Sequence, residues 1–192
     1  MINVTENVHR ILAPRLVVLI GMVAPDGRQN IIPINNMTSI STEPSRVLIA
    51  VYKEWITARN LTQAKSFTVS VPSGNQLPIV WKLGQKYSGY QSDKDKIEEF
   101  VKELDFDFSP AGPVLKNALG WIEYEILDRP DEKGGNHLLT VGEYRKAAVN
   151  PDYYTEEITP LGNPKPVMQW ERNHFAEASD IFDIEYYKDP GF

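Results

Sequence analysis

The apolar residues in the first half of the chain form short runs that are separated by turn residues. Residues 16–24 are rich in β-branched and large apolar side chains, and this run ends at Pro25-Asp26-Gly27. Proline presets φ and glycine accepts positive φ, so the tripeptide is typical of a tight turn. The apolar pattern resumes over residues 28–34, which predicts a β-hairpin. Two further runs predict strands at residues 46–52 and 67–71.

The second half of the chain contains two longer runs of strand type, residues 119–127 and 138–149. In the first of them Trp121, Glu123 and Glu125 alternate with apolar neighbours, as in a half-buried strand. These runs bring the number of predicted strands to six. A mostly β chain with six antiparallel strands favours a closed barrel, because closure leaves no exposed strand edge.

Two or three helices are predicted between these strands. A short helix begins near Thr57, which would cap it, and Leu61 faces inward. Residues 93–104 carry apolar side chains at helical spacing on one face and charges on the other. A third candidate, residues 75–83, is interrupted by Pro78.

The composition changes after Asn150. Residues 151–192 are rich in Pro, Gly, Tyr and Glu and show no clear period. We therefore expect a barrel domain over residues 1–150 and an irregular C-terminal extension over residues 151–192. Aromatic residues of the extension, such as Trp170 and Phe175, need a surface to cover. The extension is thus expected to pack on the barrel or on a partner subunit.

Composition and charge indicate an ordinary globular protein. The 192 residues are 42% apolar and 24% charged, with a formal net charge of −6. This balance argues against nucleic acid as a partner, because non-specific binding depends on clustered Lys and Arg. No apolar run reaches about 20 residues and no signal peptide is visible, so we expect a cytoplasmic protein without membrane association. The absence of cysteine excludes disulfides, and neither cysteine nor histidine spacing indicates a metal site.

The first candidate site is a polar segment between two predicted strands. Its amides, hydroxyls and backbone N–H groups suit the edge of a flat polar heterocycle such as a flavin. The alternative is a solvated loop, where such residues are common. The candidate residues are Asn35, Asn36, Met37, Thr38, Ser39 and Ser41.

A second candidate site surrounds the start of the short helix and comprises Lys53, Thr57, Arg59 and Asn60. A helix N-terminus presents unpaired N–H groups and a partial positive charge, both of which attract phosphate. Arginine can also bind phosphate through two parallel hydrogen bonds. The alternative is a capped helix with surface cations.

Three further residues could complete a ligand site. Ser88 precedes a glycine turn, and Lys96 lies near the start of the amphipathic helix, whose solvated face could equally explain it. His137 lies where a loop enters a strand, a position from which a side chain can face a ligand. A structural histidine is the alternative.

The order of these features resembles the flavin reductase-like family of FMN-binding split barrels, over about residues 12–150. No single motif is specific, but the ordered series is. The two strongest anchors are Asp26-Gly27-Arg28-Gln29-Asn30 with Pro33, Ser41 and Glu43-Pro44, and the run from Gly135 through His137 to Tyr144.

The resemblance implies a six-stranded Greek-key split barrel that forms a homodimer and binds FMN, or sometimes FAD, near the subunit interface. Asn35 to Ser39 would meet the flavin ring edge and ribityl chain, and Ser41 matches the usual serine. Thr57 would lie beside the phosphate, with Lys53 and Arg59 as supporting cations.

Ser88 and Lys96 match an element that often contacts the phosphate or a ligand, and His137 is expected on the substrate side. Many members carry Gly-Asp-His where this chain has Gly135-Asn136-His137, so a carboxylate beside the histidine is missing here.

The implied activity is that of a NAD(P)H-dependent flavin or ferric reductase, in which hydride passes from nicotinamide to flavin. The electron acceptor would be free flavin, a ferric complex or a redox partner protein. No catalytic residue is assigned, because this transfer needs no obligatory general acid. Two alternatives remain: an FMN electron carrier of flavoredoxin type without NAD(P)H turnover, and a small binding module without a cofactor.

Overall fold

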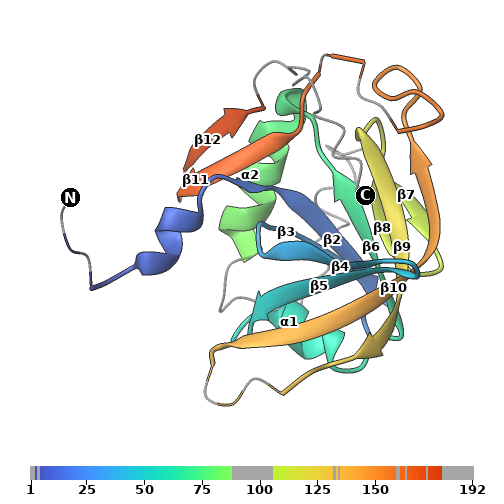
Figure 1. Ribbon diagram of the computed structural model, residues 1–192. Coiled ribbons are helices and arrows are strands. Elements are labelled where there is room, and N and C mark those ends of the chain that lie inside the picture. Colours follow the sequence, from blue (N-terminus) through green and yellow to red (C-terminus); the bar gives the residue numbers. More distant parts are fainter. Residues whose placement is uncertain are drawn as a thin grey trace, which may run out of the picture.

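The computed structural model describes residues 3, 5–87, 106–131, 133, 135–158, 161–162, 164–171 and 173–178. The expected helix at residues 93–104 lies outside this set. Two 3-10 helices, η1 (Val8–Leu12) and η2 (Gly74–Gln76), accompany the α-helices α1 (Ile56–Leu61) and α2 (Leu77–Tyr87). The strands are β1 (Arg15–Leu16), β2 (Val18–Val23), β3 (Gln29–Ile34), β4 (Met37–Thr42), β5 (Ser45–Tyr52), β6 (Ser66–Val71), β7 (Phe106–Ser109), β8 (Gly112–Leu115), β9 (Gly120–Asp128), β10 (His137–Val149), β11 (Val167–Glu171) and β12 (His174–Glu177) (Figure 1).

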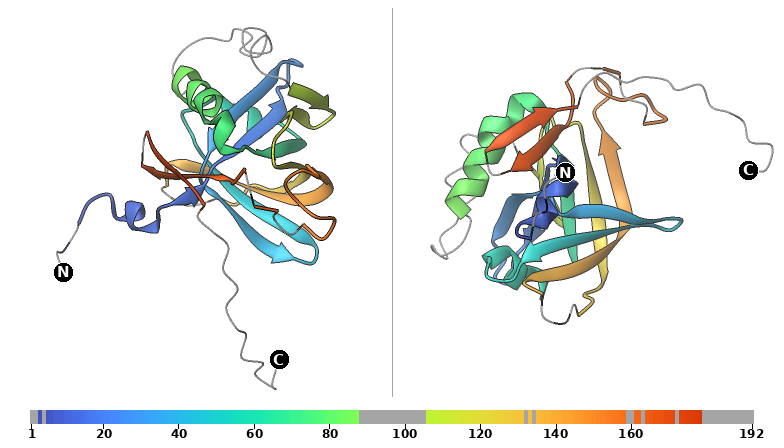
Figure 2. Two further views of the ribbon diagram at one scale, coloured as in Figure 1. Left: turned by 90° about the horizontal axis from the view of Figure 1, so that it is seen from above. Right: turned by 60° about the vertical axis from the view of Figure 1, so that its left-hand side comes forward.

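Seven strands form the central antiparallel sheet, in the order β3-β2-β6-β9-β10-β5-β4. All six strands predicted from the sequence belong to it, and β4 is the addition. The sheet curls into a barrel, which Figure 2 shows from two further sides. Its two outer strands, β3 and β4, follow each other in the chain, yet no hydrogen-bonded ladder joins them. The expectation of full closure is therefore wrong, since the barrel remains open between these strands.

Residues 37–42 of the polar segment after β3 form strand β4, which was not among the predicted strands, rather than the solvated loop that was the alternative. This strand pairs with β5, with Met37 opposite Ile49 and Thr38 opposite Leu48. Thr38 and Ser39 are exposed. Because β4 is an edge strand with little buried surface, it lacks the apolar alternation that identifies half-buried strands.

The barrel interior is filled by large apolar side chains from facing strands. Leu19, Ile20 and Phe67 are fully buried, and the Phe67 ring stacks on Tyr124 with 5.3 Å between ring centroids. Burial raises the pKa of the Tyr124 hydroxyl to about 12. The β7–β8 hairpin packs on this barrel, where Thr68 Oγ1 donates to the Pro113 carbonyl at 2.6 Å.

The two described α-helices differ from expectation at their first residues. The N-cap of α1 is Trp55, without a side-chain hydrogen bond, so the assignment of Thr57 as the cap is wrong. Thr57 lies within the helix, is 2% exposed and donates from Oγ1 to Asn30 Oδ1 at 2.9 Å. In α2, Pro78 is tolerated because the first turn of a helix does not use its N–H groups.

The C-terminal segment is more regular than its composition indicates. Strand β11 pairs with β1 and with β12, and Val17 N–H donates to the Val167 carbonyl at 2.9 Å. Phe175 of β12 meets Trp81 of α2 edge-to-face, with 5.6 Å between ring centroids. This hairpin therefore packs on the chain's own barrel, where β11, β12 and α2 lie side by side (Figures 1 and 2). Within the described residues, no helix is long and apolar enough to cross a membrane.

Candidate functional site

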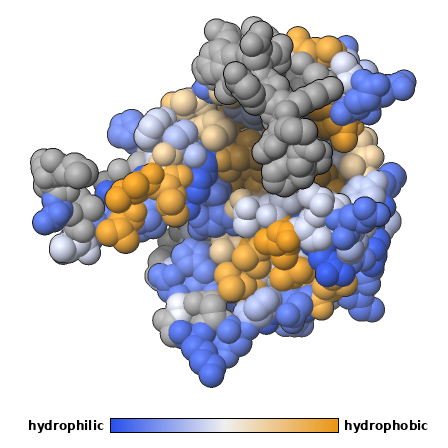
Figure 3. Space-filling view, in the orientation of Figure 1, coloured by the Kyte–Doolittle hydropathy of each residue, from blue (hydrophilic) through white to orange (hydrophobic). Residues whose placement is uncertain are grey.

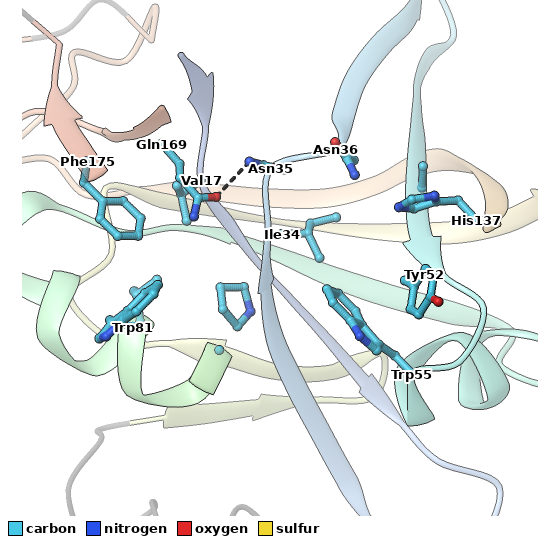
Figure 4. Close-up of a pocket in the computed structure, with 14 residues that line it drawn as sticks. Val17, Ile34, Asn35, Asn36, Tyr52, Trp55, Trp81, His137, Gln169 and Phe175 are labelled. Atoms are coloured by element: carbon cyan, nitrogen blue, oxygen red, sulfur yellow. Dashed lines mark hydrogen bonds between the residues drawn. The ribbon is translucent and has the colours of Figure 1, made fainter. Parts of the chain in front are cut away.

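A cavity of about 480 Å³ lies where α2 and the C-terminal hairpin meet the end of the barrel. Two groups of aromatic side chains flank it (Figure 4). Trp81 and Phe175 lie on one side, from α2 and β12. Tyr52 and Trp55 lie on the other side, and their two rings meet edge-to-face at 70°. These rings give the cavity flat apolar walls.

Amide side chains line the rim of this cavity. Asn35 and Asn36 connect β3 to β4, at the opening of the barrel. Asn35 Nδ2 donates to Gln169 Oε1 of β11 at 2.8 Å, the contact drawn as a dashed line in Figure 4. Asn36 Oδ1 accepts from Arg15 Nη1 at 2.6 Å. The C-terminal hairpin and β1 thus fix the orientation of both asparagine side chains.

His137 reaches the same cavity from β10. The register between β10 and β5 sets His137 opposite Tyr52, and their rings meet edge-to-face at 5.8 Å. Its Nδ1 lies 2.6 Å from Asn136 Oδ1. Lys53 Nζ donates to the Gly135 carbonyl at 2.7 Å, which ties the loop before β10 to the end of β5.

A second cavity, of about 670 Å³, adjoins the first. The two cavities share Asn35, Asn36, Ala50, His137 and Gln169. The second cavity is also lined by Arg15 of β1, Trp170 of β11, Asn136, and His9 and Arg10 of η1. An aromatic cavity and a polar, basic one therefore meet at a wall of amides and one imidazole.

The structure brings together only part of the residue set predicted from the sequence. Asn35, Asn36 and His137 line both cavities. Met37 packs partly against the core, whereas Thr38, Ser39 and Ser41 lie along β4 and line neither cavity.

Neither cavity is lined by any of the four predicted phosphate-binding residues Lys53, Thr57, Arg59 and Asn60. Lys53 lies next to the loop before His137, while Arg59 and Asn60 lie on α1 and line neither cavity. The Thr57 hydroxyl is occupied by Asn30. Ser88 and Lys96 lie outside the described residues.

Several cavity residues were not predicted as part of the site. Tyr52 precedes Lys53 and Trp55 follows it by two residues, so these aromatic side chains could have been added to the second candidate site from the sequence. Arg15, Trp81, Gln169 and Phe175 come from distant segments. Only the pairing of β11 with β1 and the packing of β12 on α2 bring them to the cavity.

The flavin reductase-like domain model matches residues 10–178 of this chain. The chain belongs to the flavin reductase-like family. The match extends past the expected boundary at residue 150, so both β11 and β12 fall within the family domain. A flavin reductase of Pseudomonas putida is 23% identical over 128 residues, which cover 67% of this chain and 69% of the relative.

Solved structures of two proteins share the fold of this family member. The flavoredoxin of Desulfovibrio vulgaris (Miyazaki F) has a TM-score of 0.79 at 17% identity, covering 97% of this chain and 99% of its own. The NADH:FAD oxidoreductase SgcE6 of Streptomyces globisporus has a TM-score of 0.73 at 19% identity, covering 94% and 99%. The expected mostly β split-barrel fold class is confirmed.

Proposed function

We propose that this flavin reductase-like protein binds FMN in the aromatic cavity and accepts hydride from NAD(P)H, acting as a flavin or ferric reductase. The observation that carries the proposal is the meeting of the two cavities at a wall of amides and His137. A flavin needs flat apolar walls for its ring and polar groups at the ring edge, and the lining offers both. The cavity volume of about 480 Å³ also falls within the range of small-molecule sites.

When bound, the flavin would supply the redox chemistry, and the chain's residues would bind and orient it. Trp55, Trp81 and Phe175 would cover apolar ring surface and exclude water. Asn35 is held through its Nδ2 by Gln169, which keeps its Oδ1 oriented as an acceptor at the rim. His137 lines both cavities, so it would contact the molecule that approaches the flavin.

The phosphate of FMN would lie toward Lys53 and Arg59, whose charges favour it. Thr57 would have to release Asn30 before its hydroxyl could join them, because that hydroxyl already donates to Asn30 Oδ1. Thr38, Ser39 and Ser41 of β4, Asn60 of α1, and Ser88 and Lys96 remain proposed contacts for the rest of the cofactor. FAD is the alternative flavin.

A second candidate function is electron carriage. The similarity in fold to a flavoredoxin over 97% of the chain favours it. In that case the protein would hold FMN and receive electrons from a redox partner protein without oxidising NAD(P)H. A reductase would instead pass electrons to free flavin or to a ferric complex.

Purified protein titrated with FMN separates these possibilities. We expect quenched flavin fluorescence, a yellow protein, and bleaching near 450 nm when NADH or NADPH is added without oxygen. Tight FMN binding without bleaching would favour the carrier. Colourless protein that quenches neither FMN nor FAD would refute the flavin-binding proposal.

We further propose that the chain forms a homodimer through η1. Val8, Ile11 and Leu12 of this helix are 55%, 72% and 71% exposed, and they form the apolar patch on the projecting N-terminal segment in Figure 3. Apolar side chains gathered on a projecting segment are typical of a protein contact. Sedimentation velocity tests the dimer: the wild type should sediment as a dimer and I11S/L12S as a monomer. A monomeric wild type would contradict the proposal.

A further inference from the structure

The basic cavity next to the aromatic one has a charge opposite to that of the whole chain. Its lining includes Arg10, Arg15, His9 and His137. None of the described residues that line either cavity is Asp or Glu, although the chain has 26 Asp and Glu against 20 Lys and Arg. A concave surface lined by one sign of charge focuses the field and attracts ligands of the opposite sign.

We infer that this basic cavity is an anion subsite for the molecule that exchanges electrons with the flavin, and that η1 supplies part of it. The inference rests on the proposed function. It assigns to His9, Arg10 and Arg15 a role that neither the sequence patterns nor the aromatic cavity requires.

Arg15 is the best-defined part of the subsite. Its Nη1 donates to Asn36 Oδ1 at 2.6 Å, and its Nε is buried without a hydrogen-bond partner among the described residues. Among the residues that the structure describes, the hydrogen-bond partner of this guanidinium is a neutral amide oxygen. A buried charged donor without an acceptor is unfavourable, so an anion at the guanidinium would satisfy a charge that the protein leaves partly unmet.

The η1 helix forms the outer wall of the subsite. It has no buried residue, and it projects from the barrel in Figures 1 and 2. His9 and Arg10 lie in its last turn and line the cavity. The η1 helix therefore adds two basic side chains to the cavity that Arg15 and His137 also line.

The shared wall defines the class of ligand. A molecule with a flat ring near Asn35 and His137 could extend its anionic group into the basic cavity, because the two cavities share these lining residues. Two sources carry such a group: the phosphates of a nicotinamide dinucleotide, or the carboxylate of a small aromatic electron acceptor. Arginine binds both groups through paired hydrogen bonds.

Isothermal titration calorimetry of FMN-saturated protein tests the inference with two probes, inorganic pyrophosphate and benzoate. R10Q and R15Q should each weaken the probe that matches the natural ligand about tenfold, the loss expected for one hydrogen bond to a charged group. R28Q is the matched control, because Arg28 pairs with Asp26 in the exposed β2–β3 turn and lines neither cavity. Its affinity should stay within about twofold of wild type.

Each outcome decides the inference. Loss of pyrophosphate affinity in R10Q identifies the dinucleotide phosphates, and loss of benzoate affinity identifies a carboxylate. Failure of both probes to bind, or equal affinities in R10Q and R28Q, overturns the subsite. Because η1 is exposed, R10Q should fold even if R15Q does not.

A separate measurement, the FMN titration, shows whether the proposed function itself fails. An FMN titration that shows no binding would refute the flavin proposal, and the pyrophosphate titrations would then be repeated on the flavin-free protein. A difference between R10Q and R28Q there would still establish an anion subsite, though not its coupling to a flavin.

Discussion

Replacing Gly142 of β10 with alanine would overpack the core of the barrel. The new Cβ would stand 2.7 Å from Cζ of Phe67 and 2.9 Å from Cβ of Tyr124. Phe67 is 0% exposed and its ring is stacked on Tyr124, so the ring has no free space into which to move. Forcing a methyl group into such a core costs about 1–3 kcal/mol. We expect G142A to lose that much free energy of unfolding.

Guanidinium chloride unfolding, followed by tryptophan fluorescence, measures the loss. G27A is the control for backbone strain alone, because Gly27 has a φ of 84° and nothing lies within 4 Å of its added Cβ. F67L removes the ring atoms that would clash, so it should cost less in the G142A background than in wild type. An unchanged midpoint in G142A, or strictly additive effects in the double variant, would show that the clash is not the cause.

Three other predictions concern the cavity and two titrating groups. W81A should weaken FMN binding about tenfold, since one stacked or edge-on aromatic contact contributes about 0.5–1.5 kcal/mol beyond its buried area. Fluorescence titration with FMN measures this, and W121A is the control because Trp121 lines neither cavity. Hydrogen bonds from Arg46 and Arg145 lower the pKa of Glu143, so the ionised carboxylate stabilises the fold above about pH 4 and this contribution disappears on acidification. The difference in free energy of unfolding between wild type and E143Q should therefore shrink as the pH falls, and a constant difference would count against this reasoning. Burial raises the pKa of Tyr124 to about 12, so wild type should lose stability between pH 10 and 12 more steeply than Y124F, and parallel curves would contradict the shift.

Local pattern was sufficient for six strands of the barrel and insufficient for β4 and for the C-terminal hairpin. The six predicted strands carry apolar side chains into the core, so their composition and alternation reveal them. Strand β4 carries few, because most of its side chains are polar and its pairing with β5 is sequence-independent backbone hydrogen bonding. Strands β11 and β12 depend on β1, more than a hundred residues away, and no local signal reports such pairing.

The candidate site was predictable where chemistry and chain position coincide. Asn35, Asn36 and His137 follow or begin strands of the barrel, and the structure places all three at the cavities. Thr57 was assigned as a helix cap because of its residue type, but its hydroxyl donates to the buried side-chain amide of Asn30, which is distant in sequence. Trp81 and Phe175 reach the cavity only through tertiary packing, which the sequence pattern alone does not encode.

The gap between β3 and β4 gives the barrel a seam, and Asn35 and Asn36 carry the chain across it. In a continuous sheet the backbone groups along both of these edges would be used by neighbouring strands, and the wall would be as rigid there as elsewhere. At the seam the wall is instead a two-residue tether, held in place from outside by Arg15 and Gln169. Changes in the length or rigidity of that tether would therefore alter the shape of the two cavities beside it while leaving the β2–β6–β9–β10 wall intact. The seam is thus where related chains could diverge in ligand at least cost to the fold.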